Sequence, residues 1–284
     1  MSPDLEPEQR PHPILEDIDR HAVEKPKLFP PTPGFKLQVG IITMTLDIVV
    51  PVFNEEHALG TSIRTLHGFL SQVLPPGWHI TIADNGSTDS TLQVARQLSD
   101  EMEGVGYIHI PEKGRGRALR RAWLESPAAA VAYMDVDLST EMESLPRLLA
   151  AMEDGAHIAI GSRLHATSQV RRSFKREALS RGYNILIRTL FRAPFRDAQC
   201  GFKALTSEAA RELVPQVRDQ SWFFDTELLL LAAHRGHTIH EVPVTWKEDP
   251  DSRVKVWKTV AEDLRGLLRL RLNFWGLTGK GTDG

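Results

Sequence analysis

Two carboxylates, Asp135 and Asp137, stand in the run Tyr-Met-Asp-Val-Asp-Leu, directly after the apolar segment Val131–Met134. In an extended segment, side chains at positions i and i+2 point to the same face. Such a pair suits Mg²⁺ or Mn²⁺, because hard cations bind through one or two carboxylates and take substrate phosphates as further ligands. The pair is therefore a candidate metal site. The competing interpretation is two solvated carboxylates that merely end a strand.

Two further polar segments follow apolar runs. Pro51-Val-Phe-Asn-Glu-Glu56 continues the run at 46–52, and Asp84-Asn-Gly-Ser-Thr-Asp89 follows the run at 79–83. Side chains at two adjacent strand ends can form a cleft for a base and its ribose, in which a carboxylate accepts from a base N–H. Gly86 would allow a close approach. For the second segment, a loop that caps the next helix is the alternative.

The segment Lys113-Gly-Arg-Gly-Arg117 precedes a predicted helix. It resembles part of a dinucleotide-binding fingerprint, but the third glycine is missing and the segment follows the third apolar run, not the first. We therefore reject a dehydrogenase. Cations at the start of a helix favour contact with phosphate, which makes Lys113 a candidate ligand of a nucleotide. A solvated basic loop is equally compatible with these residues.

The predicted strands and helices that carry these segments alternate along the chain. Short apolar runs predict strands, and apolar residues at helical spacing predict the helices between them. The predicted strands are Leu46–Val52, His79–Ala83, Val105–Ile110, Val131–Met134 and His157–Ile160, and the predicted helices are Glu56–Val73, Ser90–Leu98 and Arg117–Glu125. This alternation predicts an α/β fold with a mostly parallel, doubly wound sheet, whose ligands bind beyond the carboxyl ends of the strands.

The second half of the chain has a different pattern. It predicts a basic helical stretch at Arg171–Arg196, a loop at Asp197–Lys203, a helix at Thr226–Arg235, a strand at His237–Val244 and a last helix at Val254–Leu272. Residues 1–43 are rich in proline and charge, which predicts a disordered tail. We therefore expect three parts: this tail, a catalytic domain at 44–250, and a C-terminal amphipathic helix and tail at 251–284.

The composition excludes some classes of function. The 284 residues carry a formal net charge of -3, whereas a protein whose main partner is nucleic acid needs a basic field. A single cysteine, Cys200, excludes an internal disulfide and fits a reducing compartment. No apolar run approaches the roughly 18 to 20 residues that a bilayer span needs. We expect a soluble or membrane-peripheral protein.

Two basic stretches, 171–196 and 254–272, combine arginines with interleaved apolar residues. This pattern is typical of helices that lie on an anionic bilayer, where each cation contributes roughly 1 kcal/mol. The alternative is a pair of ordinary helices that pack on the core. We expect a cytoplasmic protein, peripheral at the inner face of the cell membrane, for which a membrane protein is a further candidate partner.

The polar segments together resemble glycosyltransferase family 2. The resemblance rests on the order Pro-Val-Phe-Asn-Glu, Asp-Asn-Gly-Ser-Thr-Asp, Lys-Gly-Arg-Gly, Asp-Val-Asp-Leu, Gly-Ser-Arg and Gln-Cys-Gly-Phe-Lys. Within the family, the chain is most similar to the polyprenyl-phosphate and dolichyl-phosphate glucosyl- and mannosyltransferases, over about residues 46–260. The resemblance implies the GT-A fold, a nucleotide-sugar donor, a divalent metal (Mg²⁺ or Mn²⁺), an inverting mechanism and a lipid phosphate as acceptor.

The resemblance also implies roles for single residues. The residues that would bind the nucleotide-sugar are Pro51, Phe53, Glu55, Asp84, Lys113, Asp135, Lys247 and Arg253. The metal would be held by Asp135 and Asp137. The residues expected to act in catalysis are Asp137, Arg163 and Asp225. Mannosyl relatives commonly have an Arg followed six residues later by a Lys, where this chain has Lys247 and Arg253. They often have a Gln, a potential third metal ligand, where this chain has Ser139.

The expected acceptor removes the need for a strong catalytic base. A phosphomonoester is already anionic at neutral pH, because its second pKa is about 6. The enzyme must instead hold two repelling anions together and stabilise the departing nucleoside diphosphate, which is work for a metal and for cations. We expect Arg163, Lys247 and Arg253 to divide the donor and acceptor phosphates among them.

Two segments bear on the choice of donor. Asp197-Ala-Gln-Cys-Gly-Phe-Lys203 and Trp222-Phe-Phe-Asp225 resemble the glucosyl branch of the family more than the mannosyl branch, which favours UDP-glucose. Asp225 is a candidate for contact with the sugar or its phosphate, with a helix cap as the alternative. GDP-mannose as donor and a soluble sugar as acceptor stay open. The intact metal carboxylates argue against a non-catalytic nucleotide-binding module.

Overall fold

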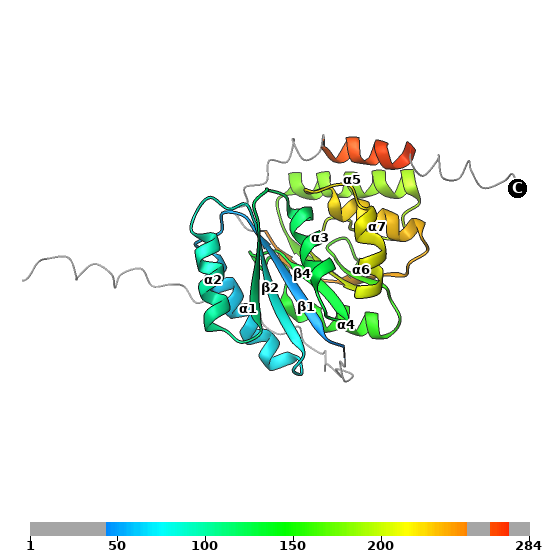
Figure 1. The fold of residues 1–284 in the computed structure, drawn as a ribbon. Helices are drawn as coiled ribbons and strands as arrows, with labels where there is room; N and C mark the ends of the chain where they lie inside the picture. Colours follow the sequence, from blue (N-terminus) through cyan, green and yellow to red (C-terminus); the bar gives the residue numbers. More distant parts are fainter. Residues whose placement is uncertain (1–43, 249–261, 273–284) are drawn as a thin grey trace, which may run out of the picture. The chain divides into compact units, whose positions relative to one another are not determined.

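The apolar runs form a seven-stranded sheet in the computed structural model, which describes residues 44–248 and 262–272. Its order is β3-β2-β1-β4-β7-β5-β8 (Figure 1). The strands are β1 (Leu46–Val52), β2 (Trp78–Asn85), β3 (Val105–Ile110), β4 (Ala130–Met134), β5 (Ile158–Ser162), β7 (Phe202–Thr206) and β8 (Ile239–Pro243). Within this sheet β7 runs antiparallel to both neighbours, and the other pairs are parallel. The expected mostly parallel sheet is confirmed.

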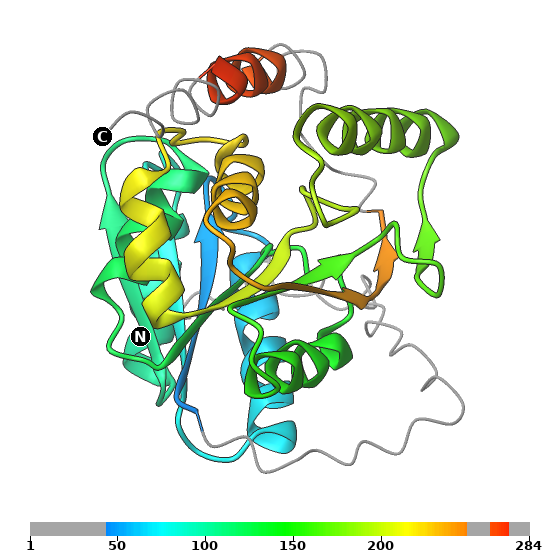
Figure 2. The same cartoon turned by 90° about the vertical axis from the view of Figure 1, so that its right-hand side faces the viewer.

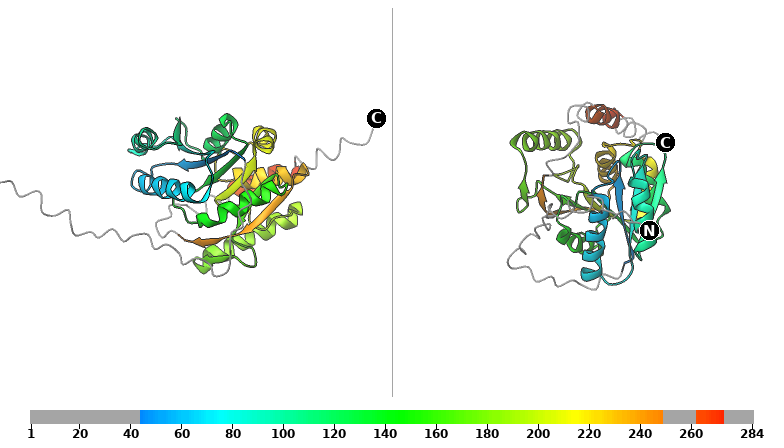
Figure 3. Two further views of the ribbon diagram at one scale, coloured as in Figure 1. Left: turned by 90° about the horizontal axis from the view of Figure 1, so that it is seen from below. Right: turned by 90° about the vertical axis from the view of Figure 1, so that its left-hand side faces the viewer.

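Helices cover both faces of this sheet (Figure 3). They are α1 (Leu59–Val73), α2 (Thr91–Glu101), α3 (Arg115–Glu125), α4 (Leu145–Glu153), α5 (Phe174–Phe191), α6 (Ser207–Leu213) and α7 (Phe224–His234). Successive residues of β1 alternate between two cores: Ile48 and Val50 pack with α1, α2 and α4, whereas Val49 packs with α3, α6 and α7. Because both faces of the strand are buried, its sequence is a continuous apolar run and not an alternating one.

The first half follows the prediction closely, whereas the second half departs from it. The bounds of β1 and β3 are those expected. The expected loop at 197–203 instead leads into β7, and neither β7 nor α6 was anticipated. The expected strand at 237–244 is present as β8, which is shorter at both ends. A further strand, β9 (Thr245–Lys247), follows it without having been anticipated and pairs with β6 (Gln169–Arg171) in a separate two-stranded sheet.

The basic stretch at 171–196 is helical only over α5, which ends where Arg192 adopts a left-handed backbone conformation. Residues 262–272 form a second helix at the same end of the protein as α5 (Figure 2). Its Leu267 and Leu270 are buried, and a Cβ added at Gly266 would lie 2.5 Å from Phe223 Cδ1, so the helix packs closely on the start of α7.

Some expectations fall on other parts of the chain. The predicted tail at 1–43, the first part of the last helix, the C-terminal tail and Arg253 lie outside the described residues. Among the helices that the structure describes, none has the length and apolar character that crossing a bilayer requires.

Candidate functional site

The loops that follow β1 and β2 are tied together at the carboxyl edge of the sheet. The strands pair in parallel with Val52 opposite Asp84, so the two loops emerge side by side. The Asn54 backbone N–H donates to Ser87 Oγ over 2.9 Å, and Asn54 Oδ1 accepts from the Thr88 backbone N–H over 2.8 Å. Asn54 holds a left-handed conformation, with φ of 57°. The two expected nucleotide-binding segments thus form one platform.

An aromatic ring and a cation meet on this platform. Lys113 Nζ lies 3.4 Å from the centroid of the Phe53 ring, which is a cation–π contact. The loop that carries Lys113 is held from below, because Asn85 Oδ1 accepts from the Gly114 backbone N–H over 3.0 Å. The structure therefore brings together Phe53 and Lys113, and Glu55 stands on the same loop as Phe53. Pro51 is buried within β1, below these side chains.

Asp84 lies beneath the platform and not on its surface. Its side chain is 0% exposed. Asp84 Oδ2 lies 2.6 Å from His109 Nδ1 on the neighbouring strand β3, and Oδ1 accepts from the Ser87 backbone N–H over 3.3 Å. Both carboxylate oxygens are thus engaged, and the contact between Asp84 and a base stays a prediction.

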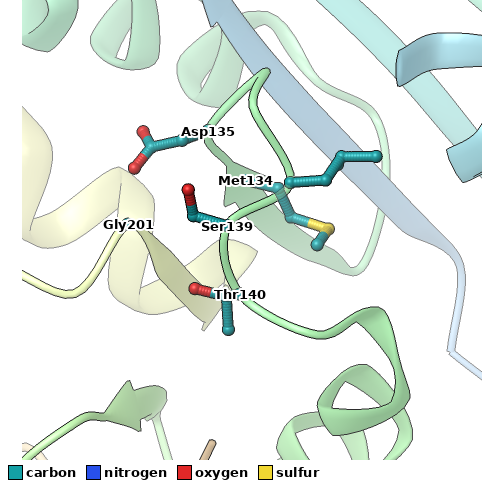
Figure 4. Close-up of a pocket in the computed structure, with 6 residues that line it drawn as sticks. Met134, Asp135, Ser139, Thr140 and Gly201 are labelled. Carbon is teal, nitrogen blue, oxygen red and sulfur yellow. The ribbon is translucent and has the colours of Figure 1, made fainter. Parts of the chain in front are cut away.

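The two candidate metal ligands follow β4, as expected. The Asp135 side chain is 43% exposed. Asp137 is exposed, and its Oδ1 accepts from the Ser139 backbone N–H over 2.9 Å. The loop is turned by Leu138, whose φ is 49°. A small pocket here is lined by Met134, Asp135, Leu138, Ser139, Thr140 and Gly201 (Figure 4).

Gly201 fixes the position of the Asp135 carboxylate. The Asp135 backbone N–H donates to Gly201 O over 3.3 Å, which brings the end of β4 against the start of β7. A Cβ at Gly201 would lie 2.5 Å from Asp135 Cγ, and closer still to Oδ2. The carboxylate therefore occupies the space that any larger residue at 201 would need.

The donor set at this pocket fits Mg²⁺ or Mn²⁺ bound together with a substrate. Within the part of the chain that the structure describes, no three His, Cys, Asp or Glu side chains gather to hold a metal. Mg²⁺ is usually bound through one or two carboxylates, and waters and substrate phosphates complete its octahedral shell. Asp135 and Asp137 would supply these carboxylates, and the exposure of both would leave room for a diphosphate.

Arg163 is already bound to another side chain. Its Nε donates to Asp197 Oδ2 over 2.8 Å and its Nη2 donates to Oδ1 over 2.9 Å, while Asp197 is 0% exposed. Burial by itself would raise the pKa of the Asp197 carboxyl, but the charge and hydrogen bonds of Arg163 outweigh it and lower this pKa to about 2. Nη1 of Arg163 is not used in this pair. Its contact with a phosphate stays a prediction.

Lys247 lies beside the loop that carries the metal candidates. It ends β9, where its backbone N–H donates to Ser139 O over 3.0 Å. Trp246 bridges to Thr140, and its ring faces the Arg163 guanidinium at 5.6 Å. One short strand therefore places the backbone of an exposed lysine against Ser139, two residues from Asp137, and an aromatic ring against Arg163.

Asp225 lies inside the protein at the start of α7, and its side chain is 2% exposed. It accepts from Tyr133 Oη over 2.6 Å, pairs with Lys203 Nζ at 3.1 Å and pairs with Arg115 Nη1. Burial would raise the pKa of the Asp225 carboxyl, but the charges of Lys203 and Arg115 prevail and hold it below its usual value. The expected contact of Asp225 with the sugar stays a prediction.

Sequence reasoning overlooked three members of this buried cluster: Arg115, Tyr133 and Lys203. A signal existed for Lys203, because a lone lysine inside the apolar run Phe202–Leu205 must have a buried partner if that run is a strand. No comparable signal marks Arg115, whose partner Asp225 stands 110 positions later.

Comparisons with known proteins place the chain in a family. The family model described as glycosyl transferase family 2 matches residues 47–214. The glycosyltransferase AglD of Haloferax volcanii is 33% identical over 82% of this chain, which spans 37% of that protein. The dolichyl-phosphate beta-glucosyltransferase of Drosophila melanogaster is 31% identical over 78% of this chain and 74% of that protein.

A solved structure has the same fold. It is glucosyl-3-phosphoglycerate synthase from Mycobacterium tuberculosis in complex with Mn²⁺, UDP and glucosyl-3-phosphoglycerate, with a TM-score of 0.64 and 18% sequence identity. The match covers 84% of this chain and 85% of that chain. At this identity the likeness concerns the fold alone, and it confirms the GT-A fold that the sequence led us to expect.

Proposed function

The chain belongs to glycosyl transferase family 2, and on this premise we propose that it transfers glucose from UDP-glucose to a polyprenyl or dolichyl phosphate, with inversion at the anomeric carbon. The observation that carries the proposal is the placement of Lys247 and Arg163 around the loop of Asp135 and Asp137. Cations and carboxylates so arranged suit a reaction between two phosphate-bearing substrates. The Drosophila relative, named a dolichyl-phosphate beta-glucosyltransferase, supports the choice of sugar and acceptor.

We assign the platform to the nucleotide. Phe53 would present a ring face to the base, and the ammonium of Lys113, which lies 3.4 Å from the centroid of that ring, would bind a ribose or phosphate oxygen. Glu55 follows on the same loop, while Pro51 and Asp84 support it from within the sheet. We propose UDP as the nucleotide of the donor, and the assay below distinguishes it from GDP.

Asp135 and Asp137 would hold the divalent metal. A bound Mg²⁺ or Mn²⁺ neutralises the charge that gathers on a departing diphosphate. Cationic side chains of the protein would bind the phosphates of the two substrates. Arg163, oriented by its two hydrogen bonds to Asp197, would bind one phosphate, and Lys247 on β9 would bind the other. A phosphate acceptor is ionised at neutral pH, so no side chain needs to remove a proton from it.

We propose that the protein binds to a membrane surface. Large apolar side chains face outward on both helices at one end of the protein: on α5 Phe174 is 85% exposed and Ile185 62%, and on the helix at 262–272 Leu268 is 63% exposed and Leu272 62%. Figures 1 and 2 show these two helices at that end. Arg188 is exposed three residues after Ile185 on α5 and adds a cation to this surface, whereas Arg181 is paired with Glu177. Such a surface favours contact with an anionic bilayer, which contains the proposed acceptor.

A donor and acceptor assay tests the proposed activity. The full-length protein with Mn²⁺ or Mg²⁺ receives labelled UDP-glucose or GDP-mannose, and either a short polyprenyl phosphate or phosphoglyceric acid. We expect label in the organic extract with UDP-glucose and polyprenyl phosphate, and none after chelation of the metal. Label from GDP-mannose would reassign the donor, and label in a water-soluble product would reassign the acceptor. No product in any arm would contradict the proposed function.

Sedimentation with liposomes tests the location separately. We expect the protein to sediment with liposomes that contain anionic lipid at low salt, and to be released as salt screens the arginines. The paired change Ile185→Ser and Leu268→Ser removes two outward apolar side chains and should weaken sedimentation. Unchanged sedimentation of this variant would contradict the role of these helices.

A further inference from the structure

We propose that Arg115 is a positioning residue that fixes the orientation of the metal-binding carboxylate Asp135, an inference that rests on the proposed function. The sequence singled out Lys113 from this basic loop, whereas the contacts of the structure single out Arg115. Its side chain is 11% exposed, compared with 49% for Arg121 on the same helix α3.

The guanidinium of Arg115 joins two carboxylates. Its Nη2 donates to Asp135 Oδ1 over 3.1 Å, and its Nη1 donates to Asp225. The guanidinium carbon lies 4.7 Å from the centroid of the Tyr133 ring on β4 and 5.2 Å from that of Trp222, which belongs to the segment before α7. A planar guanidinium suits such a site, because it can direct parallel donors at two acceptors while it stacks on rings.

The buried charges balance only if Asp135 is included. Arg115 and Lys203 are cations, and Asp225 is the anion between them, with Lys203 0% and Asp225 2% exposed. Tyr133 adds no charge, because a tyrosine hydroxyl is neutral at pH 7. Asp135 supplies the second anion. Since Asp135 is 43% exposed, it is the one member of this group of four charges that also reaches the candidate metal site.

The backbone on both sides of Arg115 is closely packed. A Cβ at Gly114 would lie 2.5 Å from Gln220 O, and one at Gly116 would lie 2.6 Å from Phe224 Cβ, so the start of α3 is pressed against the segment that leads into α7. On the opposite side, Gly201 confines Asp135 Oδ2. One carboxylate oxygen is therefore held by Arg115 and the other by close packing, which leaves Asp135 a single orientation.

Two effects of Arg115 on a bound metal oppose each other, so their net sign is informative. As a cation near the site, Arg115 repels a metal, and its removal would by charge alone tighten metal binding. As the partner that fixes Asp135, it prepares a ligand, and its removal would weaken metal binding. Loss of an outer-shell partner of a metal ligand typically costs about 10- to 100-fold in affinity, so we expect the positioning effect to prevail.

The test is Mn²⁺ binding in the presence of UDP, followed by the paramagnetic resonance signal of free Mn²⁺. Arg115→Met should raise the Kd for Mn²⁺ by about 10- to 100-fold. Arg115→Lys keeps the charge but loses the paired N–H donors of the guanidinium, and its Kd for Mn²⁺ should fall between those of Arg115→Met and wild type. Arg121→Met removes the same charge from the exposed side of α3 and, as the loss of a surface ion pair, should stay within about twofold of wild type.

Further readouts separate positioning from simple loss of structure. Excess Mn²⁺ should restore much of kcat in Arg115→Met, which a folding defect would not allow, and thermal unfolding of each variant shows whether it is folded. If Arg115→Met is unstable, Arg115→Lys carries the test. Wild-type or tighter Mn²⁺ binding in the folded Arg115 variants would overturn the inference. If the wild-type protein itself bound neither Mn²⁺ nor UDP, the proposed function would fall, and the inference with it.

Discussion

Replacing Gly201 by alanine should disable the site with little effect on folding. The added Cβ would lie 2.5 Å from Asp135 Cγ, whereas ordinary contacts begin at 3.4 Å, so the carboxylate must move by about 1 Å. Misplacement of a reacting group by about 1 Å can cost about 100-fold in rate. The φ of Gly201 is not positive, so alanine meets no backbone strain there. We therefore expect kcat/KM to fall by about 100-fold or more, with thermal unfolding nearly unchanged.

The assay is glucose transfer to polyprenyl phosphate, measured at several Mn²⁺ concentrations. Gly68→Ala is the matched control, because Gly68 lies in α1 and its added Cβ would meet nothing within 4 Å. This control should keep wild-type activity and gain up to about 1 kcal/mol of stability, as alanine is the better helix former. A folded Gly201→Ala protein with wild-type kcat/KM would refute the placement of Asp135 against Gly201.

Three further predictions concern other buried groups. Burial, with Asp219 and Glu262 nearby, raises the pKa of Asp263 to about 7. Because the folded state then holds the proton more tightly than the unfolded chain, the free energy of unfolding should fall as pH rises from about 4 to about 7. Asp263→Asn should remove this pH dependence from thermal unfolding. Arg163→Ala leaves the buried Asp197 without the guanidinium that pairs with it and should lower the free energy of unfolding by about 3–5 kcal/mol in urea. Adding Asp197→Ala in a double variant should restore part of this loss. An unchanged urea midpoint in Arg163→Ala would contradict the ion pair. Burial raises the pKa of the Cys200 thiol to about 12, so the folded protein should resist iodoacetamide at pH 8 and react after unfolding, and rapid labelling of folded protein would contradict this burial.

The sequence revealed the elements whose signal is local. β1 and β3 were predicted with their observed bounds, because a strand buried on both faces is a continuous apolar run. The placement of Asp135 at the carboxyl edge followed from the same reasoning, since parallel topology sets which strand ends meet. β7 was missed because Lys203 interrupts its apolar run, and the partners that allow this lysine to be buried, Tyr133 and Asp225, are distant in the sequence.

One missed element did carry a local signal. Thr206 accepts from the Ala209 backbone N–H over 3.2 Å and so caps α6, and a threonine ahead of Ser-Glu-Ala-Ala is a recognisable helix start. The partners of the site residues carried none. The resemblance to the family identified Arg163, but its pairing with Asp197 becomes visible only when β5 and the segment before β7 lie side by side.

The structure of the reaction product tests the proposed glucosyl transfer most directly. The protein, Mn²⁺, UDP-glucose and a short polyprenyl phosphate are incubated, and the lipid fraction is examined by mass spectrometry and by proton NMR at the anomeric position. We expect a glucosyl polyprenyl phosphate in the β configuration, and no such product when Asp137→Asn replaces the wild-type protein. An α-configured product, or no sugar lipid from folded wild-type protein with any donor, would contradict it.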